Sequence, residues 1–301
     1  MSLNICTQRK YDTCSKNIYF VPQRPQSRVC GCMLDSLWSL VGAPSTVHAP
    51  STAHAPCTLL HRRLDGRSWT TMIEELRRLD RPVVMRNVTG TSGAGFRALT
   101  LPSVLASRWG DTEVVLSSAN AHSYGRRRIR LADYLHDQRL APDETAAERQ
   151  CGDSAWEDGR ADEIFYWFGE HGPELEPLLE EYRRAAAFAD PPVFSDLRRP
   201  ALSFGAAPHN SGVPFHTHND GFAEVMHGAK RWLLYPPDRS PPHFAPNTTS
   251  AAWLREVYPT LPAGDAPDEC VIYPTDVLYF PNGWHHAVVN IGNTVFMSTF
   301  F

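Results

Sequence analysis

The sequence predicts a mainly β protein whose core is a sandwich or a closed barrel. From residue 201 onward, short apolar runs of strand length follow one another, with glycine, proline, asparagine or aspartate between them. Spacing typical of a helix interrupts this series only near residues 249–257. Within the series His216 and His218 stand two apart, and residues two apart on a strand point to the same face of a sheet.

The composition is that of an ordinary globular protein. Of the 301 residues, 42% are hydrophobic and 21% are charged, which suits one large domain or two small ones. The net charge of −4 gives no reason to expect nucleic acid as a partner. The sequence has no run of 18 apolar residues, so no membrane span is expected, and its first residues lack the continuous apolar core of a signal peptide.

Residues 1–57 are expected to form a disordered or poorly defined N-terminal extension. The segment 43–48 recurs almost unchanged as 49–54, and such a repeat of alanine, proline, serine, threonine and histidine cannot build a packed core. Five of the seven cysteines fall in this extension, and their odd total leaves the disulfide pairing undetermined. The main domain is therefore expected over residues 58–301, with a barrel core over about 201–301.

Between residues 58 and 200 the sequence predicts helices and strands that support the barrel. Helices are expected over residues 73–79, 102–110, 131–135 and 173–188, and strands over 81–88, 113–117 and 163–168. The basic run Arg126–Arg130 is interpreted as a solvated face. The polar and acidic stretch 138–160 is interpreted as a surface loop.

In the barrel core the expected strands are short. They cover residues 202–205, 213–218, 222–226, 231–235, 269–273, 276–280, 286–290 and 294–299, with a helix over 249–257. His227-Gly228-Ala229 is expected to separate two of these strands. Trp232, Tyr235 and Trp284 are expected in the core, and Cys270 is interpreted as a small buried residue.

Three histidines form a candidate metal site. His286 lies 68 residues after His218, where a distant strand of a barrel could carry it to the pair formed by His216 and His218. Imidazole suits iron, zinc, copper and nickel. The alternative is that the pair are ordinary barrel residues that hold no metal. His285 is expected to be a packing residue or an indirect contact of the site.

The order of several motifs resembles the jumonji C family of iron- and 2-oxoglutarate-dependent oxygenases. The motifs are His216-Thr-His218, Gly228-Ala-Lys230, Pro274-Thr-Asp276 and Trp284-His-His286, and the resemblance covers about residues 58–301. It implies a double-stranded β-helix, a jelly-roll or cupin-like barrel, with N-terminal helices packed outside. It also implies Fe(II) and 2-oxoglutarate as cofactors, and an activity that hydroxylates a protein side chain or demethylates methyl-lysine.

The resemblance assigns roles to individual residues. His216 and His286 match the first and the distal metal ligands of the family. Lys230 matches the lysine that pairs with the far carboxylate of 2-oxoglutarate, and Ser298 lies where the last strand offers a polar group to the co-substrate. Tyr166 is a further candidate for the pocket wall, with a place in the core as its alternative.

His218 departs from the family pattern, which has aspartate or glutamate at that position. Three neutral ligands leave the charge of Fe(II) uncompensated, so zinc or nickel becomes a stronger competitor. Asp220 is a candidate substitute ligand, provided that the turn signal Asn219-Asp220-Gly221 folds it back sharply. Either the three histidines form a working site or the protein has lost turnover.

Three functions are compatible with these features. The first is a 2-oxoglutarate-dependent protein hydroxylase, the second a binding or regulatory protein on an impaired barrel, and the third a dioxygenase that does not need 2-oxoglutarate. A protein substrate or protein partner and a monomeric state are expected. The resemblance suggests the lumen of the endoplasmic reticulum, in agreement with glycosylation sequons at Asn87 and Asn247, whereas the missing signal peptide favours the cytoplasm.

Overall fold

The computed structural model describes most of the chain from residue 57 onward. The described residues are 57–63, 68–89, 93–118, 125–137, 165–169, 171–185, 201–246 and 248–300. All of them belong to one compact unit, Ala43–Phe301. The predictions made for residues 1–56, for the loop 138–160 and for Asn247 lie outside the described residues.

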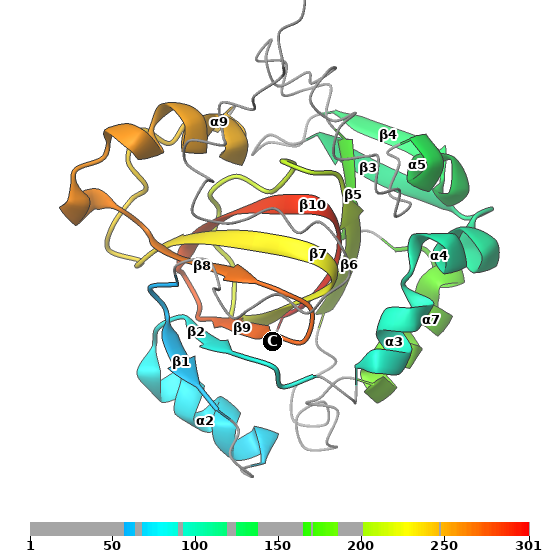
Figure 1. Ribbon diagram of the computed structural model, residues 1–301, viewed down its shortest axis with the longest axis horizontal. Helices are drawn as coiled ribbons and strands as arrows, with labels where there is room; N and C mark the ends of the chain where they lie inside the picture. Colours follow the sequence, from blue (N-terminus) through cyan, green and yellow to red (C-terminus); the bar gives the residue numbers. More distant parts are fainter. Residues whose placement is uncertain are drawn as a thin grey trace, which may run out of the picture. The chain divides into compact units, whose positions relative to one another are not determined.

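Ten strands form one mixed sheet, shown in Figure 1, in the order β1-β2-β9-β7-β10-β6-β5-β3-β4, with β8 also paired to β7. The strands are β1 (Leu60–Arg62), β2 (Val83–Met85), β3 (Glu113–Ser118), β4 (Arg126–Arg130), β5 (Phe165–Phe168), β6 (Ala201–Ala207), β7 (Gly221–Tyr235), β8 (Asp268–Ile272), β9 (Val277–Phe280) and β10 (His285–Phe300). The long strands β7 and β10 pair antiparallel along almost their whole length. The first half of β7 pairs with β9 and its second half with β8. The mainly β prediction is confirmed.

The helices surround this sheet. They are α2 (Trp69–Leu79), α3 (Ala94–Leu99), α4 (Pro102–Trp109), α5 (Leu131–Asp137), α7 (Glu176–Ala185) and α9 (Ser250–Glu256), with 3-10 turns η3 (Pro173–Leu175), η4 (Tyr258–Thr260) and η5 (Ala263–Asp265). Local signals explain several helix starts: Ser68 and Thr249 accept hydrogen bonds from Thr71 N and Ala252 N as N-caps. The predicted helices near 73–79, 102–110, 131–135 and 249–257 are confirmed in type; the predicted helix 173–188 begins as the 3-10 turn η3 and continues as α7, and residues 186–188 lie outside the described residues. None of the described helices is long and apolar enough to cross a membrane.

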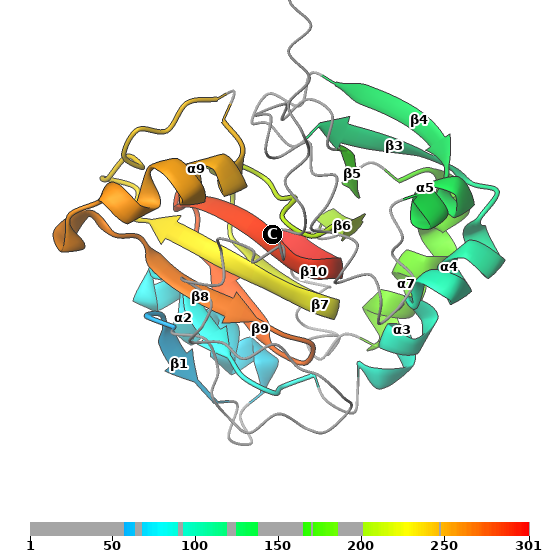
Figure 2. The ribbon, with the colours of Figure 1, turned by 45° about the horizontal axis from the view of Figure 1, so that its top comes forward.

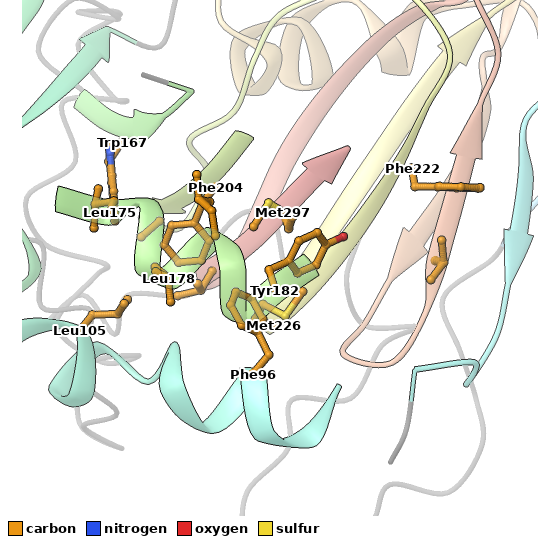
Figure 3. Packing of buried hydrophobic residues seen from close by; sticks show 14 of the residues in the cluster. Phe96, Leu105, Trp167, Leu175, Leu178, Tyr182, Phe204, Phe222, Met226 and Met297 are labelled. Atoms are coloured by element: carbon orange, nitrogen blue, oxygen red, sulfur yellow. The ribbon is translucent and has the colours of Figure 1, made fainter. Parts of the chain in front are cut away.

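The two faces of the sheet carry different apolar clusters. Figure 3 shows the outer face, where Phe96 of α3 and Tyr182 of α7 pack with Phe204 and Met297 of the strands. On the inner face, a second cluster includes Ala223, Trp232, Phe280, Trp284 and Val288. Figure 2 shows α3, α4, α5 and α7 together at one side of the curved sheet and α9 at the opposite side. Helix α9 also packs on the outer face, because its Trp253 clusters with Leu233 and Tyr235, which alternate along β7 with the inner residues Trp232 and Leu234. The inner face is therefore left for a binding site.

Strand β7 is continuous, so the predicted break at His227-Gly228-Ala229 is wrong. Gly228 has φ +78°, and a Cβ there would lie 2.4 Å from Asn293 O, so this position requires glycine. The pairing with β10 shifts register between Ile291 and Val295, which marks a β-bulge. The predicted strands 286–290 and 294–299 are likewise halves of β10. The bulge changes which residues of β7 face inward without ending the strand.

The predicted strand 213–218 is also wrong, because this segment is extended but irregular. Val288 N donates to Val213 O (3.0 Å), and His286 N donates to His216 O (3.0 Å). The two hydrogen bonds are two residues apart on β10 but three residues apart on segment 213–218, so this segment contains one extra residue, as in a β-bulge. Pro214 also lacks the N–H that a regular strand would donate to its neighbour. The backbone of this segment approaches β10 closely at Gly212. Only glycine fits there, because a Cβ on residue 212 would lie 1.8 Å from Val288 O.

Cys270 is buried, as expected, but it is not a free residue. It forms a disulfide with Cys57 across a sequence separation of 213 residues. Cys57 is half-buried and lies next to Thr58, whose N–H donates to Glu269 O of β8 (2.8 Å). The beginning of the described chain is therefore attached to β8 by a covalent bond and by hydrogen bonds.

Candidate metal centre

Three histidines from distant parts of the chain converge on the inner face. His286 is the second residue of β10. The irregular segment that runs beside the start of β10 carries His216 and His218. The ring centroids of His216 and His286 are 4.2 Å apart, and those of His218 and His286 are 4.5 Å apart. One ligand atom from each of the three residues lies within 4.8 Å of the others. The geometry suits one shared metal ion.

Each of these imidazoles is oriented by a backbone carbonyl. His216 Nδ1 lies 2.8 Å from Pro214 O, and His286 Nδ1 lies 2.9 Å from Trp284 O. His218 Nδ1 lies 2.8 Å from Asn219 O. A carbonyl can only accept, so each Nδ1 carries the proton and each Nε2 presents a lone pair. His286 Nε2 and His218 Nε2 are 3.0 Å apart, so these lone pairs point to the same region.

Burial keeps the three side chains neutral. It lowers the pKa of His216 to about 4, and it lowers the pKa of His218 and, more strongly, that of His286. Neutral imidazole is the form that binds a metal ion. The aromatic rings around the site provide this burial: the ring of Phe300 is 4.6 Å from that of His218, and the ring of Phe280 is 5.3 Å from that of His286.

Asp220 is held away from the three histidines. Its Oδ1 accepts a hydrogen bond from Asn282 N (2.6 Å), and its Oδ2 lies 3.6 Å from Arg77 Nε. Among the described residues, the only cluster with metal-ligand geometry contains the three histidines and no carboxylate. The donor set therefore fits a divalent transition metal that accepts imidazole nitrogen, but not the two-histidine, one-carboxylate pattern typical of oxygenase iron.

Lys230 lies on the same inner face and has no carboxylate partner in the part of the chain that the structure describes. Its side chain is 4% exposed, and Nζ lies 3.0 Å from the centroid of the Phe296 ring. Burial holds the pKa of this lysine well below its ordinary value. An ammonium group is costly to bury without an opposite charge, so the position favours a ligand that brings a carboxylate.

Comparison with known proteins identifies the family. Residues 180–301 match the cupin-like domain family. The chain is 40% identical over 222 residues to JmjC domain-containing protein 8 of Rattus norvegicus, which covers 73% of this chain and 74% of that protein.

The chain belongs to the JmjC family. It is also 32% identical over 98 residues to 2-oxoglutarate and iron-dependent oxygenase JMJD4 of Gallus gallus (29% of this chain, 23% of that protein). A third relative, 29% identical over 137 residues, is the bifunctional arginine demethylase and lysyl-hydroxylase psr-1 of Caenorhabditis briggsae (39% of this chain, 34% of that protein). The resemblance seen in the sequence and the predicted cupin-like fold are confirmed.

Ser298 and Tyr166 of this JmjC domain lie beside Phe296, the ring that Lys230 contacts. Ser298 is buried on β10 between Phe296 and Phe300, two residues from each, so all three share one face of the strand. Tyr166 of β5 is buried in a small cluster with Phe296. Both side chains are therefore close to the ring on which Lys230 rests, although Tyr166 also serves the core. His285 lies outside the three-histidine cluster.

One inward-facing polar residue of the JmjC domain, Asn290, was not predicted from the sequence. Asn290 pairs with Lys230 across β10 and β7, and its Nδ2 donates to Ser211 Oγ (3.1 Å). Its buried Oδ1 has no hydrogen-bond partner among the described residues, and neither has the buried indole Nε1 of Trp232. Trp232 was predicted as a core residue, and it is 3% exposed. Buried polar atoms left in this state favour a ligand or water beside them.

Proposed function

We propose that this JmjC protein is a metal- and 2-oxoglutarate-dependent oxygenase that hydroxylates a protein side chain. The observation that carries the proposal is the arrangement of three neutral histidines with their Nε2 atoms turned inward, on the same face as the buried Lys230. The relatives named as an oxygenase and as a lysyl-hydroxylase support it.

The residues have separate tasks in this proposal. His216, His218 and His286 hold the metal ion, and Lys230 binds the far carboxylate of 2-oxoglutarate as a long-stemmed point charge. Ser298 and the free Oδ1 of Asn290 orient the co-substrate directly or through water. The surrounding aromatic rings exclude bulk water from the site. A bound Fe(II) ion would supply the redox chemistry that activates dioxygen.

Metal analysis combined with a 2-oxoglutarate decarboxylation assay tests the proposal. The purified chain should retain about one equivalent of metal, and His286→Ala should lose it, because one of three ligands is removed. His285→Ala is the matched control, since this neighbouring histidine lies outside the cluster, and it should retain the metal. Full metal retention by His286→Ala would remove the proposed site.

A binding or regulatory role is the second candidate, and the lack of a carboxylate in the cluster favours it. Three neutral ligands bind Fe(II) less well relative to zinc or nickel than a set containing a carboxylate. The variant His218→Asp restores the carboxylate. Decarboxylation by the natural chain supports the oxygenase. Metal binding without decarboxylation in the natural chain, together with turnover gained in His218→Asp, supports the regulatory protein.

We further propose that the protein resides in the lumen of the endoplasmic reticulum. The Cys57–Cys270 disulfide supports an oxidising compartment. Asn87 is exposed, as a glycosylated asparagine must be. Expressed in animal cells, the protein should lose apparent mass on glycosidase treatment, and Asn87→Gln should reduce that loss. No change in mass for either protein would favour the cytoplasm.

A further inference from the structure

The two sulfur atoms of the Cys57–Cys270 disulfide lie in different surroundings. Cys270 is completely buried within β8, where it pairs in register with Trp232 of β7. Cys57 is only half-buried and precedes the first strand. An incoming thiol in solution therefore has better access to the sulfur of Cys57 than to that of Cys270.

A guanidinium group contacts the buried sulfur. Arg86 follows β2, and its Nη2 donates to Cys270 Sγ at 3.0 Å. The other terminal nitrogen, Nη1, donates to Asp276 Oδ2 (2.6 Å) and to Val271 O (2.8 Å). These two bonds hold the guanidinium in place whether or not the sulfur is bonded to Cys57.

Asp276 is in turn fixed by the backbone. It is 5% exposed, and its two carboxylate oxygens accept hydrogen bonds from Asn87 N (3.1 Å) and Tyr273 N (3.0 Å). The positive charge beside Cys270 is thus pre-organised. A neighbouring arginine stabilises a thiolate relative to a thiol, and a well-stabilised thiolate is a good leaving group in disulfide exchange.

We propose that the Cys57–Cys270 disulfide is a thiol-exchange site, in which an incoming thiolate bonds to Cys57 and Cys270 departs as a thiolate beside Arg86. The new sulfur–sulfur bond joins the incoming sulfur to Cys57 Sγ, and the bond that breaks is Cys57 Sγ–Cys270 Sγ. The electron pair of that bond stays on Cys270. A second thiolate then attacks the mixed disulfide, so two external thiols are oxidised as the protein gains two electrons.

This inference is independent of the metal site and of the proposed oxygenase activity. A purely structural disulfide would also attach residues 57–63 to β8, but it would have no need for a charge at its buried sulfur. Arg86 contacts the sulfur in the oxidised protein, but its charge stabilises the thiolate product of exchange more strongly than the neutral disulfide. The chemical class of the partner is a thiolate, from a small thiol or from a protein cysteine.

The site of the mixed disulfide tests the proposal in the natural protein. The full chain is incubated in glutathione redox buffers, quenched with acid, alkylated and digested, and the peptides that contain Cys57 and Cys270 are measured by mass spectrometry. Glutathione should be found on Cys57 while Cys270 carries the alkyl group. Glutathione on Cys270, or reduction only under conditions that unfold the chain, would overturn the proposal.

Variants of Arg86 test the role of its charge. Arg86→Gln should lower the equilibrium constant for reduction about tenfold, equivalent to about 30 mV for a two-electron couple. Arg86→Lys keeps the charge and should recover most of this loss. Arg231→Gln is the matched control, because Arg231 is a part-buried arginine that pairs with Glu269 of β8 and has no bond to the disulfide. An unchanged equilibrium constant in Arg86→Gln would overturn the inference.

Discussion

Glu224 should make the protein less stable as the pH rises from about 4.5 to 7. This carboxyl group is 4% exposed on the outer face of β7, where Tyr182 Oη donates a hydrogen bond to it. Burial raises the pKa of Glu224 to about 7, and the hydrogen bond from Tyr182 and the charge of Arg97 oppose that rise. No motif of the sequence pointed to this residue.

The free energy of unfolding decreases with pH because the folded protein binds the Glu224 proton more tightly than the unfolded chain does. Between pH 4.5 and 7 the folded protein keeps Glu224 protonated while the unfolded chain has released the proton, so unfolding becomes more favourable as the pH increases. The stabilising contribution is complete below pH 4.5 and is lost as the pH passes through 7. At about 1.4 kcal/mol for each pH unit between the two pKa values, the loss amounts to about 3 kcal/mol.

The variant Glu224→Gln removes this dependence. A glutamine can still accept the Tyr182 hydrogen bond, but it does not ionise. In urea unfolding between pH 4.5 and 8, the free energy of unfolding of the variant relative to that of the natural protein should increase by up to about 3 kcal/mol as the pH rises. Glu180→Gln, at an exposed glutamate paired with Arg183, is the control and should not change the slope. Parallel stability curves for Glu224→Gln and the natural protein would refute the reasoning.

Three further predictions concern stability and binding. Cys57→Ser should lower the free energy of unfolding by about 4–5 kcal/mol in urea titrations, because the disulfide closes a loop of 213 residues; a loss below about 1 kcal/mol would contradict the constraint. Gly212→Ala should cost about 1–3 kcal/mol through its clash with Val288 O, whereas Gly264→Ala, where a Cβ meets nothing within 4 Å, should change stability little. Lys230→Met should stabilise the ligand-free protein by about 1 kcal/mol or more and abolish 2-oxoglutarate binding in calorimetry; unchanged binding would exclude the co-substrate role.

The sequence was sufficient to find the three histidines, but for a partly incorrect reason. The spacing of His216 and His218 was interpreted as one face of a regular strand. In the structure, the extra residue near Pro214 breaks the ladder, and the histidines meet His286 because the segment follows β10 irregularly. A bulge depends on pairing with a distant strand, and local periodicity carries no information about that pairing.

The break predicted within β7 failed for a related reason. Gly228 carries the signal of a turn, and the same positive φ serves a bulge when a partner strand continues past it. Long-range partners account for the other omissions. The bond between Cys57 and Cys270 joins residues 213 positions apart, and Asn290 faces Lys230 only through the register of β7 and β10. Neither relation is visible in one sequence.

The three imidazoles of the candidate metal centre are oriented by main-chain carbonyl groups, which decides which substitutions can alter their orientation. Pro214, Asn219 and Trp284 contribute main-chain oxygens, so replacing their side chains leaves the proton on Nδ1 where it is. A carboxylate that accepted the Nδ1 proton would make the imidazole a stronger metal ligand than a main-chain carbonyl does. Substitutions of these three side chains would therefore leave the orientation of the imidazoles unchanged. A bound macromolecule that shifted the main chain would instead weaken metal binding by all three histidines together.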